Sequence, residues 1–370
     1  MMKPIRLVEP VFEKSVQEEI DAALARVAEG GKTQSSNELK ALEEELASYL
    51  GVKHAVVCAH GFEALVLGLE ALGLEQGFAK GDEIITPAFS SPLTSLAVVE
   101  AGYTPVMVDV EQENFSIHGD SIRAAIGEKT RAILPSHLFG QPANMHLVRT
   151  IAKGRRLAMV EDNAQSLGAD VRVHRKWRKA GAFSSVASTS FHESMPWGVA
   201  GNGGAVYTDD DAIAEAVRAT LGARTMEARD AALLRVKLHH LDAWAERRRE
   251  NAMRYTTGLL YHPEAAIPPQ DVYATHVFKS YTLRMVSREL RDLLRADLEK
   301  IGVETEVHYP SPVYTHESLR AFRGELERTL TADELCERVI SLPIHAGLSA
   351  EDQERIVAQI TATVDRYMNQ

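Results

Sequence analysis

The chain has 370 residues, of which 45% are hydrophobic and 25% charged, and its formal net charge at pH 7 is -11. This length suits one large domain and a smaller one. The acidic balance disfavours nucleic acid and anionic membranes as partners, because both need a concentrated basic face. Cys58 and Cys336 are the only cysteines, so a disulfide framework and a thiolate metal cage are excluded. Because there is no apolar signal core and no run near the roughly 18 apolar residues of a membrane span, we expect a soluble, cytoplasmic protein.

The first predicted element is a helix that opens at Ser35. Ser35 and Glu38 have the spacing of a capping box, in which each side chain bonds the backbone of the other residue. One apolar stripe continues from there, and it consists of Leu39, Leu42, Leu46 and Leu50.

Seven short apolar runs then alternate with amphipathic stretches, and each run has the length of a strand and is bounded by Gly, Pro or Asp. The runs cover residues 55–58, 83–86, 105–108, 132–134, 158–160, 186–191 and 205–208. Runs that are apolar on both faces suit a mainly parallel sheet covered by helices. The pattern therefore predicts a large α/β layered domain, which we assign to residues 1–250.

The pattern changes after this region. A long helix is predicted over residues 230–261, and its charged run at 246–250 is interpreted as a solvated face. Beyond Pro268 the predicted elements are a strand, a helix that Ser287 caps, a second strand and a final helix, over residues 276–285, 288–301, 303–309 and 350–367. This order predicts a smaller α+β domain, residues 251–370, that closes over the large one.

Asp162 ends one of the predicted buried strands, in the segment 160–165. Open α/β sheets bind ligands in the crevice at the carboxyl ends of their strands. A carboxylate there can pair with a protonated ring nitrogen and make the ring an electron sink. It can equally cap a following helix. The residues alone leave both interpretations open.

A serine-rich segment, residues 188–195, precedes a glycine turn at 201–204. Its hydroxyls could bind a phosphate, and the glycines allow close backbone approach. The chain has neither a Gly-x-Gly-x-x-Gly motif nor a P-loop lysine, so a generic nucleotide-binding loop is not supported. A tight turn between two strands also explains the segment.

A strand-to-helix turn at residues 59–65 is the third candidate feature. The start of a helix attracts anions through its free N–H groups and its dipole. However, Phe62 supplies no hydroxyl, and Glu63 in the first turn would repel a phosphate. His60 is then either a polar group of a site or a helix cap. No histidine pair has zinc spacing with a third ligand, so no metal is expected.

Six segments that together span nearly the whole chain resemble the DegT-type family of nucleotide-sugar and aminocyclitol aminotransferases. They are residues 47–52, 135–142, 161–169, 241–244, 307–310 and 341–345. The resemblance implies a fold-type-I architecture and a homodimer with active sites at the subunit interface. It also implies pyridoxal phosphate held by a lysine as an internal aldimine.

The resemblance also assigns roles to individual residues. Asp162 falls on the partner of the cofactor ring nitrogen, Gln165 on the residue beside the ring, and Ser190 on a phosphate-contacting serine. His192 lies three residues before the position of the lysine. That position is occupied by Met195.

Other departures from the family pattern are expected in the same pocket. They are Phe62 for a Thr or Ser, Ser91 for a stacking aromatic, Asn202 for an acidic residue, and Ala223 and Thr225 for the Asn and Arg of the partner subunit. A methionine thioether can neither form a Schiff base nor shuttle a proton. We therefore expect no covalently bound cofactor and no ordinary transamination.

The leading hypothesis is an enzyme, independent of pyridoxal phosphate, that uses the cleft for acid/base chemistry on a sugar-like or amino-polyol substrate. Dehydration, epimerisation, condensation and cyclisation all remain open. The candidate catalytic residues are His192, Asp162, His60 and Glu63. The expected substrate pocket consists of Phe62, Ser91, Gln165, Ser190, Met195, Trp197, Asn202 and His308.

Two alternatives remain. The chain could be a catalytically silent subunit that pairs with an active homologue. It could also bind pyridoxal or pyridoxamine phosphate non-covalently, through Asp162, Gln165 and Ser190. The loss of the residues at 223 and 225 argues against the first alternative, and the changed phosphate site argues against the second.

Overall fold

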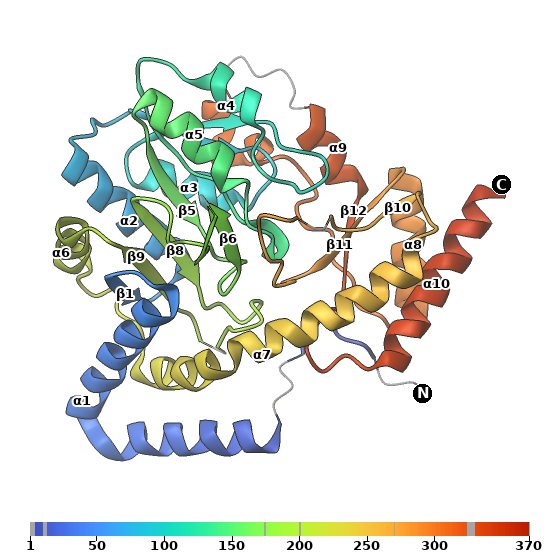
Figure 1. The fold of residues 1–370 in the computed structure, drawn as a ribbon, viewed down its shortest axis with the longest axis horizontal. Coiled ribbons are helices and arrows are strands. Elements are labelled where there is room, and N and C mark those ends of the chain that lie inside the picture. Colours follow the sequence, from blue (N-terminus) through green and yellow to red (C-terminus); the bar gives the residue numbers. More distant parts are fainter. Residues whose placement is uncertain are drawn as a thin grey trace.

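The structure is a computed structural model. It describes residues 4–9, 13–173, 175–199, 201–269, 271–323 and 330–369, and for residues 32–35 it describes the backbone alone. A central sheet lies between helices, and a smaller sheet with its own helices follows toward the C-terminus (Figure 1).

The central sheet has seven strands in the order β1-β9-β8-β5-β4-β2-β3. Neighbours from β8 to β3 are parallel, whereas β9 is antiparallel to both β8 and β1. The mainly parallel sheet expected from the sequence is thus confirmed, and its strands are the seven predicted runs. They are β1 (His54–Cys58), β2 (Glu83–Pro87), β3 (Thr104–Val108), β4 (Thr130–Ile133), β5 (Ala158–Asp162), β8 (Val186–Ser190) and β9 (Gly204–Thr208).

Both faces of this sheet are covered, because successive side chains of a strand point to opposite faces. In β1, Ala55 and Val57 pack in one core cluster with α1 and α7, whereas Val56 and Cys58 pack in another with α2. The helices of this region are α1 (Lys14–Leu50), α2 (Gly61–Gln76), α3 (Pro92–Glu100), α4 (Gly119–Ala125), α5 (Met145–Arg155), α6 (Asp211–Thr220) and α7 (Ala228–Leu259).

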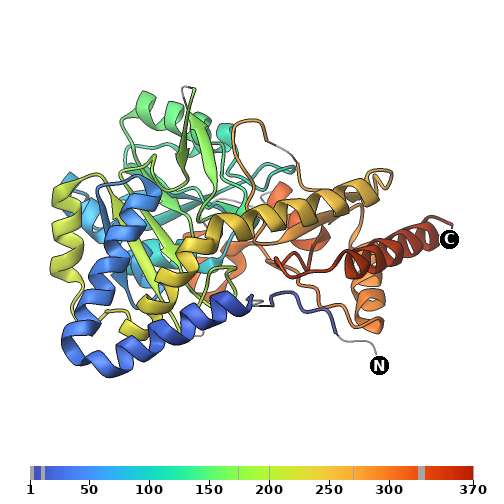
Figure 2. The ribbon, with the colours of Figure 1, turned by 60° about the horizontal axis from the view of Figure 1, so that its bottom comes forward.

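Helix α1 begins well before the predicted start at Ser35. It runs from Lys14 and bends at Gly31, whose φ of 62° and ψ of -155° are not helical. The prediction of a helix start at Ser35 was therefore wrong, and the Ser35 side chain lies outside the described residues. The first half of α1 is held by its own buried side chains, Val16, Ile20 and Ala23. Figure 2 shows α1 beside α7, which continues toward the C-terminal elements.

The C-terminal elements form a three-stranded antiparallel sheet covered by helices. They are β10 (Ala265–Ala266), β11 (Tyr281–Met285), β12 (Val339–Leu342), α8 (Arg288–Lys300), α9 (Leu330–Arg338) and α10 (Ala350–Met368). Ser287 caps α8 as predicted, since its Oγ accepts from the Leu290 N–H at 3.1 Å. The boundary at residue 250 stays a prediction, and α7 runs through it without a break.

Two predicted C-terminal strands differ from the structure. Strand β11 begins at Tyr281, five residues later than expected, and Phe278 has a φ of 46° that no strand residue adopts. The segment 303–309 is irregular apart from isolated bridges, and Tyr309 has a φ of 38°. Residues 276–280 and 303–309 are therefore loops, and both loops reach the cavity described below.

Short elements complete the described chain. A hairpin of β6 (Asp170–Val173) and β7 (Lys176–Lys179) and three short 3-10 turns were not predicted; the turns are η1 (Leu138–Gly140), η2 (Val313–Thr315) and η3 (Glu317–Phe322). Within the described ranges, none of the helices combines the length and the apolar character that crossing a membrane requires.

Candidate functional site

A cavity of about 420 Å³ lies at the carboxyl ends of β5 and β8, beside the N-terminus of α2. The structure brings all of the predicted site residues except Glu63 and Trp197 to its wall. Those that line it are His60, Phe62, Ser91, Asp162, Gln165, Ser190, His192, Met195, Asn202 and His308. The cavity is thus formed where an open α/β sheet presents its ligand crevice.

Trp197 requires a correction, because it is a core residue. Its side chain is only 2% exposed and packs in the cluster that includes Phe191 and Leu241. Its indole N–H donates to the carbonyl oxygen of Ser190 at 3.0 Å. Trp197 therefore holds the serine segment from the core side and does not reach the cavity.

Glu63 also lies off the cavity wall, in the first turn of α2. Burial raises the pKa of the neighbouring Cys58 thiol to about 12, and the charge of Glu63 adds to that shift. His60 occupies the N-cap position of α2 without a side-chain capping bond, so the interpretation of His60 as a helix cap is not supported.

Asp162 is the last residue of β5, and its carboxylate is fixed by three donors. Oδ2 accepts from Thr94 Oγ1 at 2.7 Å and from Ser136 Oγ at 3.1 Å. Oδ1 accepts from the Ala164 N–H at 3.2 Å. A turn follows β5 where a helix was one alternative, so Asp162 does not cap a helix. Its carboxylate is held rigidly at the cavity wall.

The preceding residue, Glu161, anchors this strand end from the buried side. Its Oε2 lies 2.9 Å from Nε2 of His137 and accepts from the Gly181 N–H at 2.8 Å. Its Oε1 accepts from the Phe183 N–H at 3.0 Å. Burial alone would raise the pKa of Glu161, but His137 and the backbone donors outweigh it and hold that pKa below the ordinary value.

Gln165 connects two loops at the cavity. Its Oε1 accepts from the Phe139 N–H at 2.9 Å, and its Nε2 donates to Tyr309 Oη at 2.7 Å. Both ends of the amide are thus engaged by the protein. The bond places the Tyr309 phenol on the cavity wall, a position that the sequence did not indicate.

The loop after β8 carries His192 and Met195. His192 Nδ1 accepts from the Ser194 N–H at 3.2 Å, so the neutral ring carries its proton on Nε2. The backbone N–H of His192 donates to Ser190 Oγ at 3.3 Å. Met195 is partly buried against the core and lines the cavity.

The N-terminus of α2 is tightly closed against the serine segment. A Cβ added at Gly61 would lie 2.4 Å from Ser190 Cβ, and one at Gly204 would lie 2.4 Å from the His60 carbonyl oxygen. Among the described residues that line the cavity, Asp162 is the one acidic residue and Lys279 is the one lysine. No arginine is among the described residues that line it.

Lys279 is the functional candidate that sequence reasoning missed. Its Nζ lies 2.8 Å from Nε2 of His308, and the same nitrogen of His308 lies 3.2 Å from Glu306 Oε2. Burial lowers the pKa of Lys279 to about 8, against a smaller raising effect of Glu306. Burial, with the charge of Lys279, lowers the pKa of His308 to about 3. The predicted strand over 276–285 concealed this loop; a lysine inside an apolar run was the available signal.

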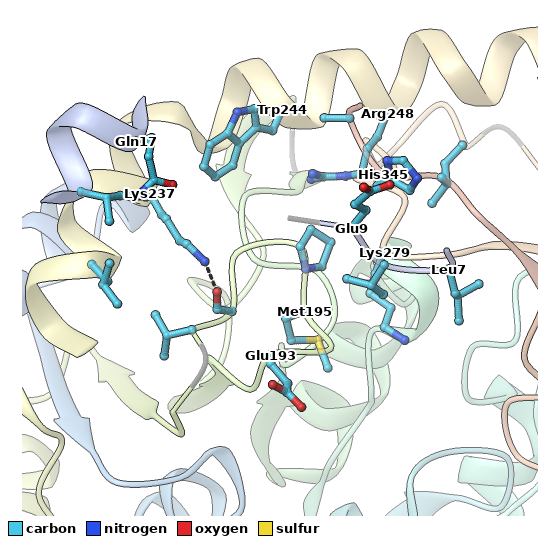
Figure 3. Close-up of a pocket in the computed structure, with 18 of the residues that line it drawn as sticks. Leu7, Glu9, Gln17, Glu193, Met195, Lys237, Trp244, Arg248, Lys279 and His345 are labelled. Carbon is cyan, nitrogen blue, oxygen red and sulfur yellow. Dashed lines mark hydrogen bonds between the residues drawn. The ribbon is translucent and has the colours of Figure 1, made fainter. Parts of the chain in front are cut away.

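A second cavity of about 370 Å³ shares Met195 and Lys279 with the first. Figure 3 shows these two residues on one side of it, with Lys237 and Arg248 on the side of α7. Lys237 Nζ donates to the Gly198 carbonyl oxygen, and burial lowers the pKa of Lys237 to about 8. Within the described ranges, no group of three or more His, Cys, Asp or Glu side chains is placed to hold a metal ion.

Two of the positions at which the resemblance implies a departure from the family lie outside these cavities. Ala223 and Thr225 are exposed on the loop between α6 and α7, and the structure places neither at the cavity of the same chain.

Comparisons with known proteins agree with this architecture. The model of the DegT/DnrJ/EryC1/StrS aminotransferase family matches residues 14–361. The erythromycin biosynthesis sensory transduction protein EryC1 of Saccharopolyspora erythraea is 37% identical over 361 residues, with 94% of this chain and 96% of that protein covered. The dTDP-3-amino-3,4,6-trideoxy-alpha-D-glucose transaminase of Streptomyces venezuelae is 35% identical, with 95% and 94% covered.

Solved structures show the same fold. The crystal structure of DesV from S. venezuelae has a TM-score of 0.86 at 33% identity, with 95% of this chain and 96% of that chain covered. A DegT DnrJ EryC1 StrS aminotransferase from Brucella abortus has a TM-score of 0.85 at 28% identity, with 94% and 96% covered. The chain therefore belongs to the DegT/DnrJ/EryC1/StrS aminotransferase family.

Proposed function

We propose that this chain is an enzyme that does not transaminate through a lysine at position 195. It uses the larger cavity for acid/base chemistry on a sugar-like or amino-polyol substrate. The observation that carries the proposal is that Met195, His192 and Asp162 line the same cavity. A thioether holds no aldehyde and moves no proton, whereas an imidazole and a carboxylate can.

The residues present do not fit pyridoxal phosphate held in the manner of the family. The position that the resemblance assigns to the lysine has no amine, and Phe62 gives the phosphate end no hydroxyl. Glu63 places a negative charge in the first turn of α2. Gln165 already uses both ends of its amide within the protein. The proposal therefore routes no step through that cofactor.

His192 and Asp162 are the proposed acid/base pair. The fixed carboxylate of Asp162 is suited to hold a substrate hydroxyl or accept a proton. His192 keeps Nδ1 as an acceptor within its own loop, so its Nε2–H can donate a proton to a substrate oxygen, and Asp162 is left as the base. Ser91, Ser190 and Tyr309 add hydroxyl groups to the wall. A lining of this kind suits a substrate rich in hydroxyls, and pockets from about 300 Å³ hold small ligands.

The names of the relatives support the substrate class. One is a transaminase of a dTDP-linked amino sugar, and another, from Pseudomonas aeruginosa, is named for a UDP-linked 3-oxo sugar acid. We infer that the substrate of this chain carries a carbonyl, because an oxo group acidifies the neighbouring C–H bond. Proton abstraction beside a carbonyl is then the reaction class, with Asp162 as the base and His192 as the acid that donates to the carbonyl oxygen.

We further propose a homodimer with the site at the interface. In that assembly, the loop with Ala223 and Thr225 would approach the partner's cavity without the Asn and Arg that the resemblance assigns there. A silent subunit of a heteromer is the competing outcome. It would be inactive alone and would raise the activity of an active homologue.

The test is hydrogen exchange on a dTDP-linked oxo-sugar in D₂O. Purified wild-type chain should introduce deuterium at the carbon beside the carbonyl, as measured by mass spectrometry. His192→Gln and Asp162→Asn should each lower that rate by about 10²-fold or more, as for loss of a general acid or base. Exchange that is equal in wild type, both variants and buffer would overturn the acid/base proposal.

A further inference from the structure

Lys279 lies in the loop before β11, and backbone hydrogen bonds join this loop to η1. The Val277 N–H donates to the Gly140 carbonyl oxygen at 2.9 Å, and the Ser280 N–H donates to the Phe139 carbonyl oxygen at 3.2 Å. A Cβ added at Gly140 would lie 2.7 Å from the backbone nitrogen of Lys279. The backbone on both sides of the lysine is therefore pinned.

The side chain of Lys279 is buried without a carboxylate partner. It is 8% exposed, it lines both cavities, and its polar contact is the imidazole of His308. Among the described residues, no Asp or Glu oxygen lies within 4.0 Å of Nζ. Four acidic groups belong to its surroundings. Glu306 has its Oε2 3.2 Å from the same nitrogen of His308, Asp162 lines the larger cavity, and Glu9 and Glu193 line the smaller one.

His308 completes the arrangement. Its side chain is 9% exposed, and its Nδ1 has no hydrogen-bond partner among the described residues. When Lys279 donates to Nε2, the neutral ring carries its proton on Nδ1. A buried N–H without a partner is costly, so this atom is available to an oxygen of a bound molecule.

We propose that Lys279 is a nucleophilic amine that forms an imine with the ketone or aldehyde carbon of a sugar-like substrate, positioned by His308. This inference rests on the proposed function, because it places the carbonyl substrate in the same cavity. It also explains how a chain with Met195 keeps an amine at the cavity wall.

The step balances without a redox partner. The neutral amine attacks the carbonyl carbon, a C–N bond forms, and the carbonyl oxygen takes a proton to give a carbinolamine. The C–O bond then breaks, and the oxygen leaves as water. The net change converts a lysine ammonium and a carbonyl into a protonated imine and water. That imine withdraws electrons more strongly than the carbonyl, so it acidifies the C–H bond on which Asp162 would act as the base.

The environment of Lys279 favours its reactive form. Only a neutral amine attacks a carbonyl, and a lysine of ordinary pKa is about 0.04% neutral at pH 7. Burial lowers the pKa of Lys279 to about 8, which makes about a tenth of it neutral at that pH. Lys237 offers a matched comparison, since burial lowers its pKa to about 8 as well. However, Lys237 donates to the Gly198 carbonyl oxygen, and it lines the smaller of the two cavities but not the larger.

The inference can be tested by trapping the imine. The full chain is incubated with dihydroxyacetone and sodium borohydride, and the occupancy of the reduced adduct is measured at each lysine by peptide mass spectrometry. Lys279 should be labelled about tenfold or more above Lys237 and above exposed lysines such as Lys40. The pH profile of labelling should have its midpoint near the pKa of about 8.

Variants separate the chemistry from a structural role. Lys279→Met and Lys279→Arg should lose the adduct, whereas Lys237→Met should keep it at residue 279. His308→Gln should lower the labelling of Lys279 and shift its pH midpoint. Because the first result uses wild-type protein, a variant that fails to fold does not remove the test. The inference is overturned if the labelling of the lysines increases only with their solvent exposure, or if Lys279 is not labelled.

The two proposals fail separately. An unlabelled Lys279 with intact deuterium exchange would remove the imine and leave the acid/base function. If Lys279 is labelled but no deuterium is exchanged in D₂O, the reactive amine is supported and the proposed roles of His192 and Asp162 are refuted.

Discussion

The Nζ atom of Lys279 lies 2.8 Å from Nε2 of His308, and both side chains line the cavity that Met195 also lines. Lys279 and His308 are 29 residues apart in the chain and lie in two different loops of the C-terminal region. Their meeting gives the cavity a buried amine with a neutral partner.

Burial of Lys279 should make the stability of the chain depend on pH. The pKa of this lysine falls from 10.5 to about 8 on folding, so between these values the unfolded chain binds more protons than the folded chain. Stability therefore rises with pH in this window. Lys279→Met removes the effect, so its free energy of unfolding should exceed that of wild type most below pH 8. Urea unfolding at about pH 7 and 9.5 tests this, and a difference that stays constant with pH would contradict it.

Replacing Met195 by lysine should not restore firm binding of pyridoxal phosphate. The Phe62 side chain supplies no hydroxyl, and each lost hydrogen bond to a charged phosphate typically costs about 1.5–3 kcal/mol. We expect that Met195→Lys loses added cofactor on gel filtration, as judged by its visible absorbance. The double variant Met195→Lys/Phe62→Thr should retain more of it. Equal, full retention by the single variant would show that the phosphate end is intact.

Loss of the Gln165 amide should destabilise the cavity wall. Gln165→Ala leaves the buried Phe139 N–H without its acceptor and the Tyr309 hydroxyl without its donor. An unsatisfied buried group costs about 1–3 kcal/mol. Urea unfolding should show a loss in that range. Gln17→Ala is the matched control, because Gln17 bonds Asp21 on the exposed side of α1 and should change stability by less than about 0.5 kcal/mol.

The buried pair of Glu161 and His137 should be a major support of the strand that carries Asp162. Glu161→Gln keeps the shape but removes the charge, and breaking a buried pair costs about 3–5 kcal/mol. Because the folded pKa of Glu161 is lowered, its contribution is present above the ordinary carboxyl pKa and is lost on acidification through the folded value. The difference in free energy of unfolding between wild type and Glu161→Gln should therefore shrink at acidic pH. Asp211→Asn, at an exposed His54 contact, should leave stability nearly unchanged.

The sequence predicted the central sheet well because its signal is local. Each of the seven strands is a short run that is apolar on both faces, and a strand covered by two helix layers requires that pattern. The position of Asp162 at a strand end followed from the same pattern. Its fixed carboxylate did not, since Thr94 and Ser136 come from other segments.

Failures occurred where tertiary contacts set the backbone. Phe278 adopts a positive φ while its N–H bonds Nδ1 of His276, and the backbone of Gly140 packs closely against the same loop. An apolar run alone indicates a strand there, so the loop and its buried lysine were missed. At α1 the error was a helix predicted too short. The chain bends at Gly31, but it is helical on both sides of that bend.

The most direct test of the central claim is transamination itself. The wild-type chain, pyridoxal phosphate and L-glutamate are incubated together, and 2-oxoglutarate is measured against a mixture without the chain. Because Met195 supplies no amine at the position proposed for the lysine, the rate with the chain should equal the rate without it. A rate well above that background would contradict the claim that this chain does not catalyse transamination, whether or not Lys279→Met abolishes the rate.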